Sequence, residues 1–224
     1  MSSPGVNPAS SGWLLESGRR ICTHWPLKMA GTTVGMSVFF VAYFWLLEHP
    51  IFPVTEMPLT ALDRWIAFRP ESLVPYMSLW IYVTLLPALL RTRRELAECA
   101  VAWVVLSAAG LGCFLFWPTA VPMRLLPGEL PPEVAFLKAM DAAGNACPSL
   151  HVAFAVFSAV AFTRVLREIK APEWVRVFNW MWCAGIGYST VAIRQHVVID
   201  VVAGAALGAV VAWGYARVGR ARNR

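Results

Sequence analysis

Charged residues are rare in this chain, and they separate six long apolar stretches. The stretches cover residues 29–47, 72–90, 99–123, 142–163, 177–193 and 197–215. A helix needs about 20 residues to cross the roughly 30 Å of hydrocarbon in a bilayer, and buried strands are much shorter than this. The pattern therefore predicts an all-α integral membrane protein built as a bundle of six transmembrane helices.

Prolines modify several of these predicted helices. Pro118 is expected to end the third helix early, and the fourth is expected to begin only near Pro148. Between the first two spans, residues 59–68 have an amphipathic pattern and lie among prolines that break any continuous helix. This segment predicts a short helix at the membrane interface, where it would act as a structural cover.

The composition agrees with a membrane protein and excludes several other classes. The residues AVILMFWYC make up 58% of the 224 residues, and DEKR make up 14%. Soluble domains are about 45–50% apolar and about 25% charged, so a soluble fold, a disordered chain and a collagen-like chain are all excluded. The five cysteines lack the spacing of zinc or disulfide sites, and we assign no role to them: Cys22, Cys99, Cys113, Cys147 and Cys183.

The distribution of basic residues predicts how the bundle is oriented. Of the 19 Lys and Arg residues, 14 fall in the terminal segments and in the loops on the same side. The other five fall in the opposite loops: Arg64, Arg69, Arg124, Lys138 and Arg194. Because cytoplasmic loops carry an excess of Lys and Arg, both termini are expected in the cytoplasm. The net charge of +6 then requires no nucleic-acid partner.

We expect a single membrane domain at residues 28–218. It would lie between a cytoplasmic N-terminal segment, residues 1–27, and a basic cytoplasmic tail, residues 219–224. The three loops that face outward contain most of the unusual polar residues. Ionisable groups at a membrane are costly, so these loops are where functional residues are expected.

The first polar cluster is formed by Arg194, His196 and Asp200, where the fifth loop enters the sixth span. His196 and Asp200 are four residues apart and share one face of a helix. An acid on one imidazole nitrogen fixes the tautomer and leaves the other nitrogen free to attack. Arg194 could bind an oxyanion with its forked guanidinium. The alternative is a structural His–Asp pair at a helix start, in which the two side chains only hydrogen-bond each other.

The second polar cluster opens the fourth span with the sequence Asn145-Ala-Cys-Pro148-Ser149-Leu-His151. Pro148 followed by Ser149 is typical of a helix N-terminus. The free backbone N–H groups and the positive end of the helix dipole make such a terminus an anion site, with His151 beside it. The alternative is a capped helix with a solvated histidine.

The two clusters lie on the same predicted face of the membrane, which favours phosphoryl transfer because that chemistry needs positioning and charge stabilisation. Two other classes stay open. One is a transporter or structural membrane protein in which the polar residues of the cluster only hydrogen-bond one another. The other is a metal site formed by His151, His196, Asp141 and Asp200, which the neighbouring cation of Arg194 disfavours.

Three motifs together resemble the type 2 phosphatidic acid phosphatase superfamily, which includes membrane lipid phosphatases, soluble acid phosphatases and vanadium haloperoxidases. They are Pro148-Ser149-Leu150-His151, then His196-x-x-x-Asp200, then Ala203-Gly204. Within it, the chain is most similar to the branch of the fungal aureobasidin-target inositol phosphotransferase. That likeness extends through the segments LDRWIAFRP, SLWIYVTLLP, FWPTAVPMR and DAAGNACPSLHVAFA.

The resemblance implies a role for each motif residue. His196 would attack phosphorus to form a phosphohistidine, Asp200 would orient it, and His151 would protonate the departing oxygen and later activate the acceptor. Ser149 and Arg194 would bind the phosphate, and three further residues are candidate phosphate ligands, namely Arg124, Lys138 and Asn145. No metal or other cofactor is implied. The implied partner is a lipid phosphate in the bilayer, and no protein partner is predicted.

This sequence departs from the superfamily pattern at three points. The first motif usually has Lys, six residues and then Arg-Pro, whereas Trp117 and Leu125 occupy the corresponding positions around Arg124. The Ser-Arg of the third motif is Ser189-Thr190 here, and the Gly of the second motif is Leu150.

The chemistry common to the superfamily leaves two acceptors open. The enzyme could pass the phosphoryl group to water, as a lipid phosphatase acting on a phosphate ester or pyrophosphate. It could instead pass it to an alcohol, as a headgroup phosphotransferase. The expected location is the bacterial inner (plasma) membrane, with the active site facing the periplasm or exterior.

Overall fold

The computed structural model describes residues 8–126, 128–140 and 144–221, and it is mostly helical. The helices are α1 (Pro8–Cys22), α2 (Trp25–Glu48), α3 (Ala61–Trp65), α4 (Leu73–Met77), α5 (Leu79–Leu89), α6 (Arg93–Phe116), α7 (Pro132–Met140), α8 (Leu150–Glu168), α9 (Glu173–Ala192) and α10 (Val198–Ala221). Two 3₁₀ turns (Pro70–Ser72 and Met123–Leu125) and two short parallel strands, β1 (Thr55–Glu56) and β2 (Thr119–Ala120), complete the described elements.

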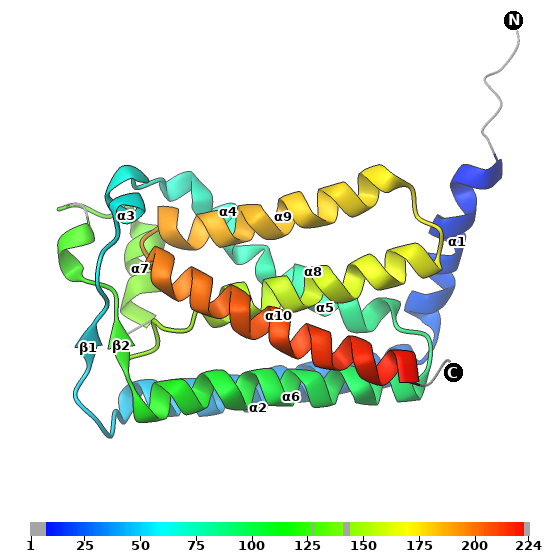
Figure 1. Ribbon diagram of the computed structural model, residues 1–224, viewed down its shortest axis with the longest axis horizontal. Helices are drawn as coiled ribbons and strands as arrows, with labels where there is room; N and C mark the ends of the chain where they lie inside the picture. The colour runs from blue at the N-terminus through cyan, green and yellow to red at the C-terminus, as the bar shows by residue number, and fades with distance from the viewer. Residues whose placement is uncertain (1–7, 127, 141–143, 222–224) are drawn as a thin grey trace, which may run out of the picture.

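The long helices lie side by side along the longest axis of the molecule (Figure 1). Five helical segments in the described residues are long and apolar enough to cross a membrane: Trp25–Glu48, Pro70–Leu89, Arg93–Phe116, Leu150–Glu168 and Val198–Gly219. They coincide with five of the six predicted spans. The sixth, α9, is a 20-residue helix packed beside α8, but Glu173, Arg176 and Asn179 lower its apolar character, so six spans stay a prediction.

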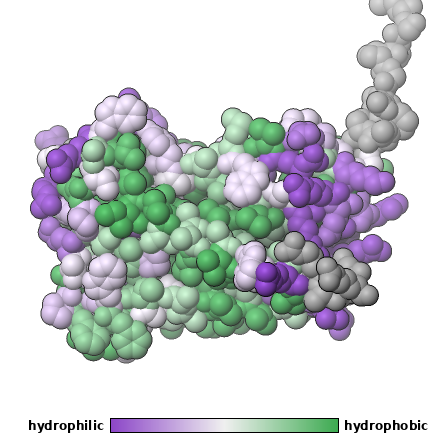
Figure 2. Space-filling model, in the orientation of Figure 1, coloured by the Kyte–Doolittle hydropathy of each residue, from purple (hydrophilic) through white to green (hydrophobic). Residues whose placement is uncertain are grey.

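The surface has the layout of a membrane protein. In Figure 2, hydrophobic residues cover the middle of the visible face and hydrophilic residues gather at its two ends. Large apolar side chains stand exposed along the long helices, including Val38, Val104, Met181 and Val202. An exposed apolar area of this extent is stable against lipid rather than water.

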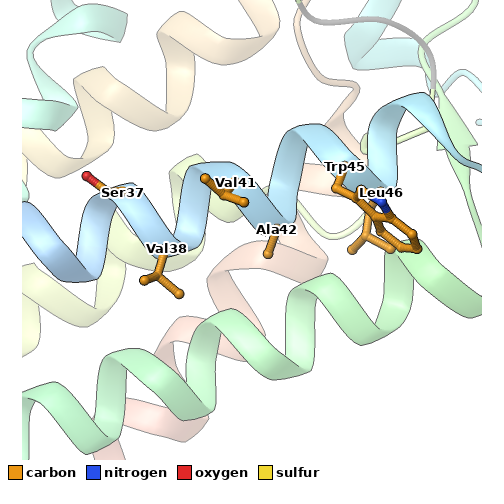
Figure 3. Close-up of a pocket in the computed structure, with 6 residues that line it drawn as sticks. All are labelled: Ser37, Val38, Val41, Ala42, Trp45 and Leu46. Atoms are coloured by element: carbon orange, nitrogen blue, oxygen red, sulfur yellow. The ribbon is translucent and has the colours of Figure 1, made fainter.

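A groove of about 580 Å³ runs along α2 (Figure 3). Its lining is apolar apart from one serine: Ser37, Val38, Val41, Ala42, Trp45 and Leu46. We assign no chemistry to this groove because no ionisable side chain lines it.

Several boundaries were predicted correctly. Helix α6 ends at Phe116, directly before Trp117 and Pro118, and α8 begins at Leu150, two residues after Pro148. The predicted short helix is present as α3, with a capping box formed by Thr60 and Asp63, but it is shorter than the expected 59–68. Its position at a membrane interface stays a prediction.

Three features of the described structure were not predicted: helix α1, helix α7 and the β1–β2 pairing. Helix α1 occupies much of the expected N-terminal segment, and it lies at the same end of the bundle as the last turns of α10 (Figure 1). Residues 1–7 of that segment, residues 222–224 of the expected tail, and Asp141 lie outside the described residues.

Helix α8 lies at the centre of the bundle and is the most deeply buried of the candidate spans. Alanines on its buried faces, among them Ala153, Ala155 and Ala159, allow the neighbouring helices to approach closely. On α10, a Cβ atom at Gly204 would lie 2.3 Å from the carbonyl oxygen of Ser149, and one at Gly208 would lie 2.3 Å from that of Ala153. The start of α8 and the start of α10 are therefore packed backbone against backbone.

Replacing Gly204 by Ala should destabilise the protein and impair the site near Ser149, because the new methyl group forces α10 away from α8. Overpacking of this kind costs about 1–3 kcal/mol. Thermal unfolding in detergent, followed by size-exclusion chromatography, should show a lower midpoint. The matched control is Gly214→Ala in the same helix, where no atom of another element lies within 4 Å of the new Cβ. Equal midpoints for the two variants would contradict the close approach.

Candidate active site

The start of α8 is organised by Ser149. This residue is the N-cap of the helix, and its Oγ accepts a hydrogen bond from the Val152 backbone N–H at 3.3 Å. The Ser149 backbone N–H donates to the Asp200 carbonyl at 3.0 Å, so the two motif segments are joined directly. Because Oγ acts here as an acceptor, its hydroxyl proton is still available to a bound anion.

The connection between α9 and α10 forms a tight turn. Arg194 has a left-handed backbone conformation with φ of 62°, and the backbone N–H groups of Gln195 and His196 both donate to the Thr190 carbonyl, at 2.9 and 3.0 Å. The Val197 backbone N–H donates to Asp200 Oδ2 at 3.0 Å. The Asp200 carboxylate thus caps its own helix while lying 3.6 Å from His196 Nδ1. The carboxylate therefore lies on the Nδ1 side of the His196 ring, and Nε2 is on the other side.

The two motif histidines are brought together. The ring centroids of His151 and His196 are 6.4 Å apart, close enough for both rings to contact one phosphoryl group. His151 stacks on Tyr76 with a centroid distance of 4.2 Å, and Trp80 meets it edge-on at 5.3 Å. Tyr76 and Trp80 were not identified from the sequence. They fix the plane of the His151 ring from the α4–α5 segment.

Arg194 is buried, and its forked end is bound to the main chain. Nη1 donates to the Asp63 carbonyl at 2.8 Å and Nη2 to the Ile66 carbonyl at 2.6 Å. The sequence predicted that this fork would bind an oxyanion, and this stays a prediction. Nη1 and Nη2 each have a carbonyl partner, whereas the buried Nε has none. Burial lowers the pKa of the Arg194 guanidinium, and the charge of Asp63 opposes this shift. A desolvated cation of this kind favours a nearby anion.

Asp63 is a third residue of the site that was not identified from the sequence, although its capping box with Thr60 can be read from the spacing. The side chain is fully buried in the short helix α3. Oδ1 accepts from the Val198 backbone N–H at 2.8 Å, and Oδ2 accepts from the Thr60 N–H and hydroxyl, both at 2.7 Å. Asp63 therefore attaches α3 to the first residue of α10 and positions the segment that carries His196.

The three further phosphate-binding candidates are placed differently. Lys138 on α7 donates from Nζ to the Arg194 carbonyl at 2.6 Å, so it lies beside the α9–α10 turn. Asn145 is buried and pairs with Thr119 in an isolated bridge, just before the α8 N-terminus. Arg124 is exposed and pairs with Glu56 at 3.5 Å, so it stands outside the buried cluster.

Unpartnered polar atoms concentrate in this region. In the described part of the chain, ten buried side-chain nitrogen and oxygen atoms have no hydrogen-bond partner, and eight of these belong to six residues of the two motif segments: Asn145, His151, Arg194, Gln195, His196 and Asp200. Buried polar groups in proteins are normally hydrogen-bonded. Their concentration here fits a site that binds a strongly polar ligand.

Two other kinds of chemistry can be compared with the geometry, namely a cysteine nucleophile and a bound metal ion. Burial raises the pKa of the Cys147 thiol to about 11, so this cysteine is neutral near pH 7 and is a poor nucleophile. Among the residues that the structure describes, no group of three His, Cys, Asp or Glu side chains is arranged to hold a metal ion. Asp141, a member of the metal-site alternative, lies outside them.

A model of the PAP2 superfamily matches residues 32–224, which is most of the chain. The chain belongs to the PAP2 superfamily. The type 2 phosphatidic acid phosphatase superfamily predicted from the motifs is thereby confirmed. Neither the comparison with curated proteins nor the comparison with solved structures found a match. Membership in the PAP2 superfamily supports a phosphatase-type enzyme acting on a lipid-like phosphate, and the apolar helices support an integral membrane protein.

Replacing Asp63 by Asn should lower kcat by about 10²-fold with little change in KM. One carboxylate oxygen becomes an N–H donor that faces other donors, so the α10 start shifts, and displacements of about 1 Å can cost this much. Steady-state kinetics on a lipid phosphate would measure the effect. Arg64→Gln, an exposed neighbour on α3, is the control and should retain activity. A rise in KM alone would show that Asp63 does not position the segment that carries His196.

Proposed function

We propose that this PAP2 protein hydrolyses a phosphate ester or pyrophosphate on a membrane lipid through a phosphohistidine on His196, without a metal. The observation that supports this most is the joining of the two motif segments. Asp200 Oδ2 lies 3.6 Å from His196 Nδ1, and the His196 ring lies 6.4 Å from that of His151 at the start of α8.

In the first step, Nε2 of His196 attacks phosphorus. The N–P bond forms as the bond from phosphorus to the lipid oxygen breaks, and a protonated His151 gives its proton to that departing oxygen. The developing positive charge on the His196 ring is stabilised by Asp200, whose Oδ2 lies 3.6 Å from Nδ1.

In the second step, His151 accepts a proton from water while the water oxygen attacks phosphorus. The P–N bond breaks, inorganic phosphate leaves, and His196 returns to its starting state. Throughout both steps the phosphate oxygens would be held by the Ser149 hydroxyl, Arg194 Nε and the free N–H groups at the α8 N-terminus. Lys138 and Asn145 would support this site from its edge. Arg124 would need to leave Glu56 to take part.

The orientation proposed for the site is the outer face, in a bundle of six spans. The end of the molecule that carries α1 also carries the basic connections before α6 and after α8, with Arg91, Arg93, Arg94 and Lys170. The α8 and α10 N-termini lie at the opposite end (Figure 1). Since basic loops remain cytoplasmic, the site would face the periplasm or exterior of a bacterial inner membrane.

The alternative acceptor is an alcohol, which would make the protein a lipid headgroup phosphotransferase similar to the inositol phosphotransferase branch. Leu150 in place of the usual Gly of the second motif favours this alternative. Leu150 is buried, and its side chain packs against Gly110 of α6. Both reactions share the phosphohistidine, and exclusion of water from it would decide between them.

Purified protein should release phosphate from short-chain lipid phosphates or pyrophosphates in the presence of EDTA. Inositol, glycerol and water should be offered as acceptors, and the products separated by mass. Free phosphate in the presence of both alcohols supports the phosphatase, and a phosphorylated alcohol supports the transferase. Loss of turnover on adding EDTA, with recovery on adding a divalent metal, would contradict the metal-independent mechanism.

A further inference from the structure

Helix α1 has its apolar side turned away from the protein. Three apolar residues on it stand exposed: Leu14 is 55% exposed, Leu15 is 65% and Ile21 is 47%. The side toward the bundle instead carries the residues at positions 13, 16, 17 and 20, a spacing that places them on one face. Two of these, Glu16 and Arg20, are charged. A helix that bordered water would have the reverse arrangement.

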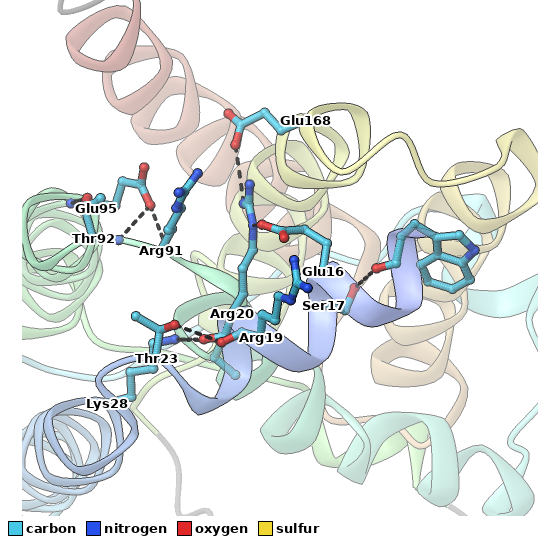
Figure 4. A network of polar contacts seen from close by, with 12 residues as sticks. Glu16, Ser17, Arg19, Arg20, Thr23, Lys28, Arg91, Thr92, Glu95 and Glu168 are labelled. Atoms are coloured by element: carbon cyan, nitrogen blue, oxygen red, sulfur yellow. Dashed lines mark hydrogen bonds and ion pairs between the residues drawn. The ribbon is translucent and has the colours of Figure 1, made fainter. Parts of the chain in front are cut away.

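This orientation is fixed by specific contacts. Trp13 packs against the hydrophobic core of the bundle. Arg20 is only 8% exposed, and its guanidinium contacts Glu16 at 3.1 Å and Glu168 of α8 at 3.4 Å (Figure 4). Lys28 on α2 donates from Nζ to the Arg20 carbonyl and, at 2.8 Å, to the Ala88 carbonyl. The polar side of α1 is therefore bound to the bundle, and its apolar side must face outward.

The outward side is continuous with the lipid-facing surface of a candidate span. Helix α2 begins at Trp25, directly after the short turn that follows α1, and its exposed first residues include Trp25, Leu27 and Met29. In Figure 1, α1 crosses the end of the bundle at a steep angle to α2. A helix joined by a two-residue turn to the end of a span must lie close to the membrane surface.

We propose that α1 is a membrane-interface helix that lies in the plane of one leaflet. Leu14, Leu15 and Ile21 would enter the boundary between headgroups and acyl chains. The leaflet would be anionic, because exposed Arg19 borders this apolar side. The connection before α6 and the first turn of α6 lie at the same end of the bundle and carry the exposed residues Arg91, Arg93 and Arg94. Binding of a protein partner would explain neither these exposed cations nor the continuity of the apolar side of α1 with the exposed start of α2.

Spin labels on α1 test this proposal directly. Leu15→Cys and Ile21→Cys would be labelled separately, with the exposed Cys22 and Cys113 replaced by Ala, and studied in nanodiscs containing phosphatidylglycerol. Val104→Cys on α6 provides a lipid-exposed reference and Glu129→Cys a water-exposed reference, since both residues are exposed. Collision rates with oxygen and with a water-soluble nickel chelate would be measured at each site.

Both α1 labels should resemble the Val104 label, with oxygen contact at least about twofold above the Glu129 reference and contact with the nickel chelate at least about twofold below it. Contact with the chelate at the Glu129 level would mean that α1 faces water and would overturn the proposal. Shielding from both reagents would mean that protein covers α1, which would also overturn it. The two labels lie on different turns of α1, so one poorly folded variant does not prevent a decision.

Discussion

His196→Ala should abolish phosphate release, lowering kcat/KM on a lipid phosphate by at least about 10³-fold. Removing the nucleophile of an enzyme that works through a covalent intermediate typically costs this much or more. The effect should be confined to the chemical step, because in the proposed site His196 would be only one of several polar groups around the phosphate. Binding of a non-hydrolysable phosphonate analogue should therefore change by less than about tenfold.

The matched control is His49→Ala. His49 is an exposed histidine that stacks on Trp45 at the end of α2, and no role is assigned to it. Its variant should retain wild-type turnover. Size-exclusion profiles of both variants would establish that they are folded. Activity of the His196 variant within tenfold of wild type would rule out His196 as the nucleophile.

His151→Ala should lower turnover of a natural lipid phosphate by about 10²–10⁴-fold, the usual contribution of a general acid or base. The loss in the first step should depend on the leaving group. A lipid alkoxide needs a proton to depart, whereas p-nitrophenolate does not. With p-nitrophenyl phosphate, the variant should therefore release one rapid equivalent of nitrophenol per active site, and then turn over slowly because no base activates water.

Stopped-flow absorbance would detect this burst. Tyr76→Phe serves as the control because it keeps the aromatic ring that stacks on His151, and it should retain most of the activity. If the His151 variant lost equal activity on both kinds of substrate and showed no burst, His151 would not be the acid and base of the reaction.

Much of the fold could be predicted because lipid imposes a simple rule on the sequence. Long apolar stretches between charges predicted the five candidate spans that the structure contains. Helix α1 could not be predicted in this way. Its charged side faces the bundle through Arg20 and Glu16, so the usual relation between polarity and exposure is inverted. Nothing in the local pattern shows that Glu168, far along the chain, compensates Arg20.

The candidate site likewise contains residues that could be predicted from the sequence and residues that could not. His151, His196 and Asp200 belong to motifs with short internal spacing, and the structure places them together; their catalytic roles stay predictions. The residues that were missed come from distant segments. Asp63 reaches Val198 from α3, and the Tyr76 ring reaches His151 from α4. Only the tertiary fold creates these contacts. The hydrogen bonds from the Arg194 guanidinium to the Asp63 and Ile66 carbonyls also depend on the tertiary fold, so they could not be predicted from the position of Arg194 beside His196.

Trapping the covalent intermediate tests the phosphohistidine mechanism most directly. Wild-type protein would be mixed with a lipid substrate labelled with ³²P at the transferred phosphate and quenched in alkali within milliseconds. The peptides would then be mapped. We predict stoichiometric label on the peptide containing His196, stable in alkali and lost in acid, and absent from His196→Ala. Full turnover of substrate without any labelled peptide, or a label on another residue, would contradict the mechanism.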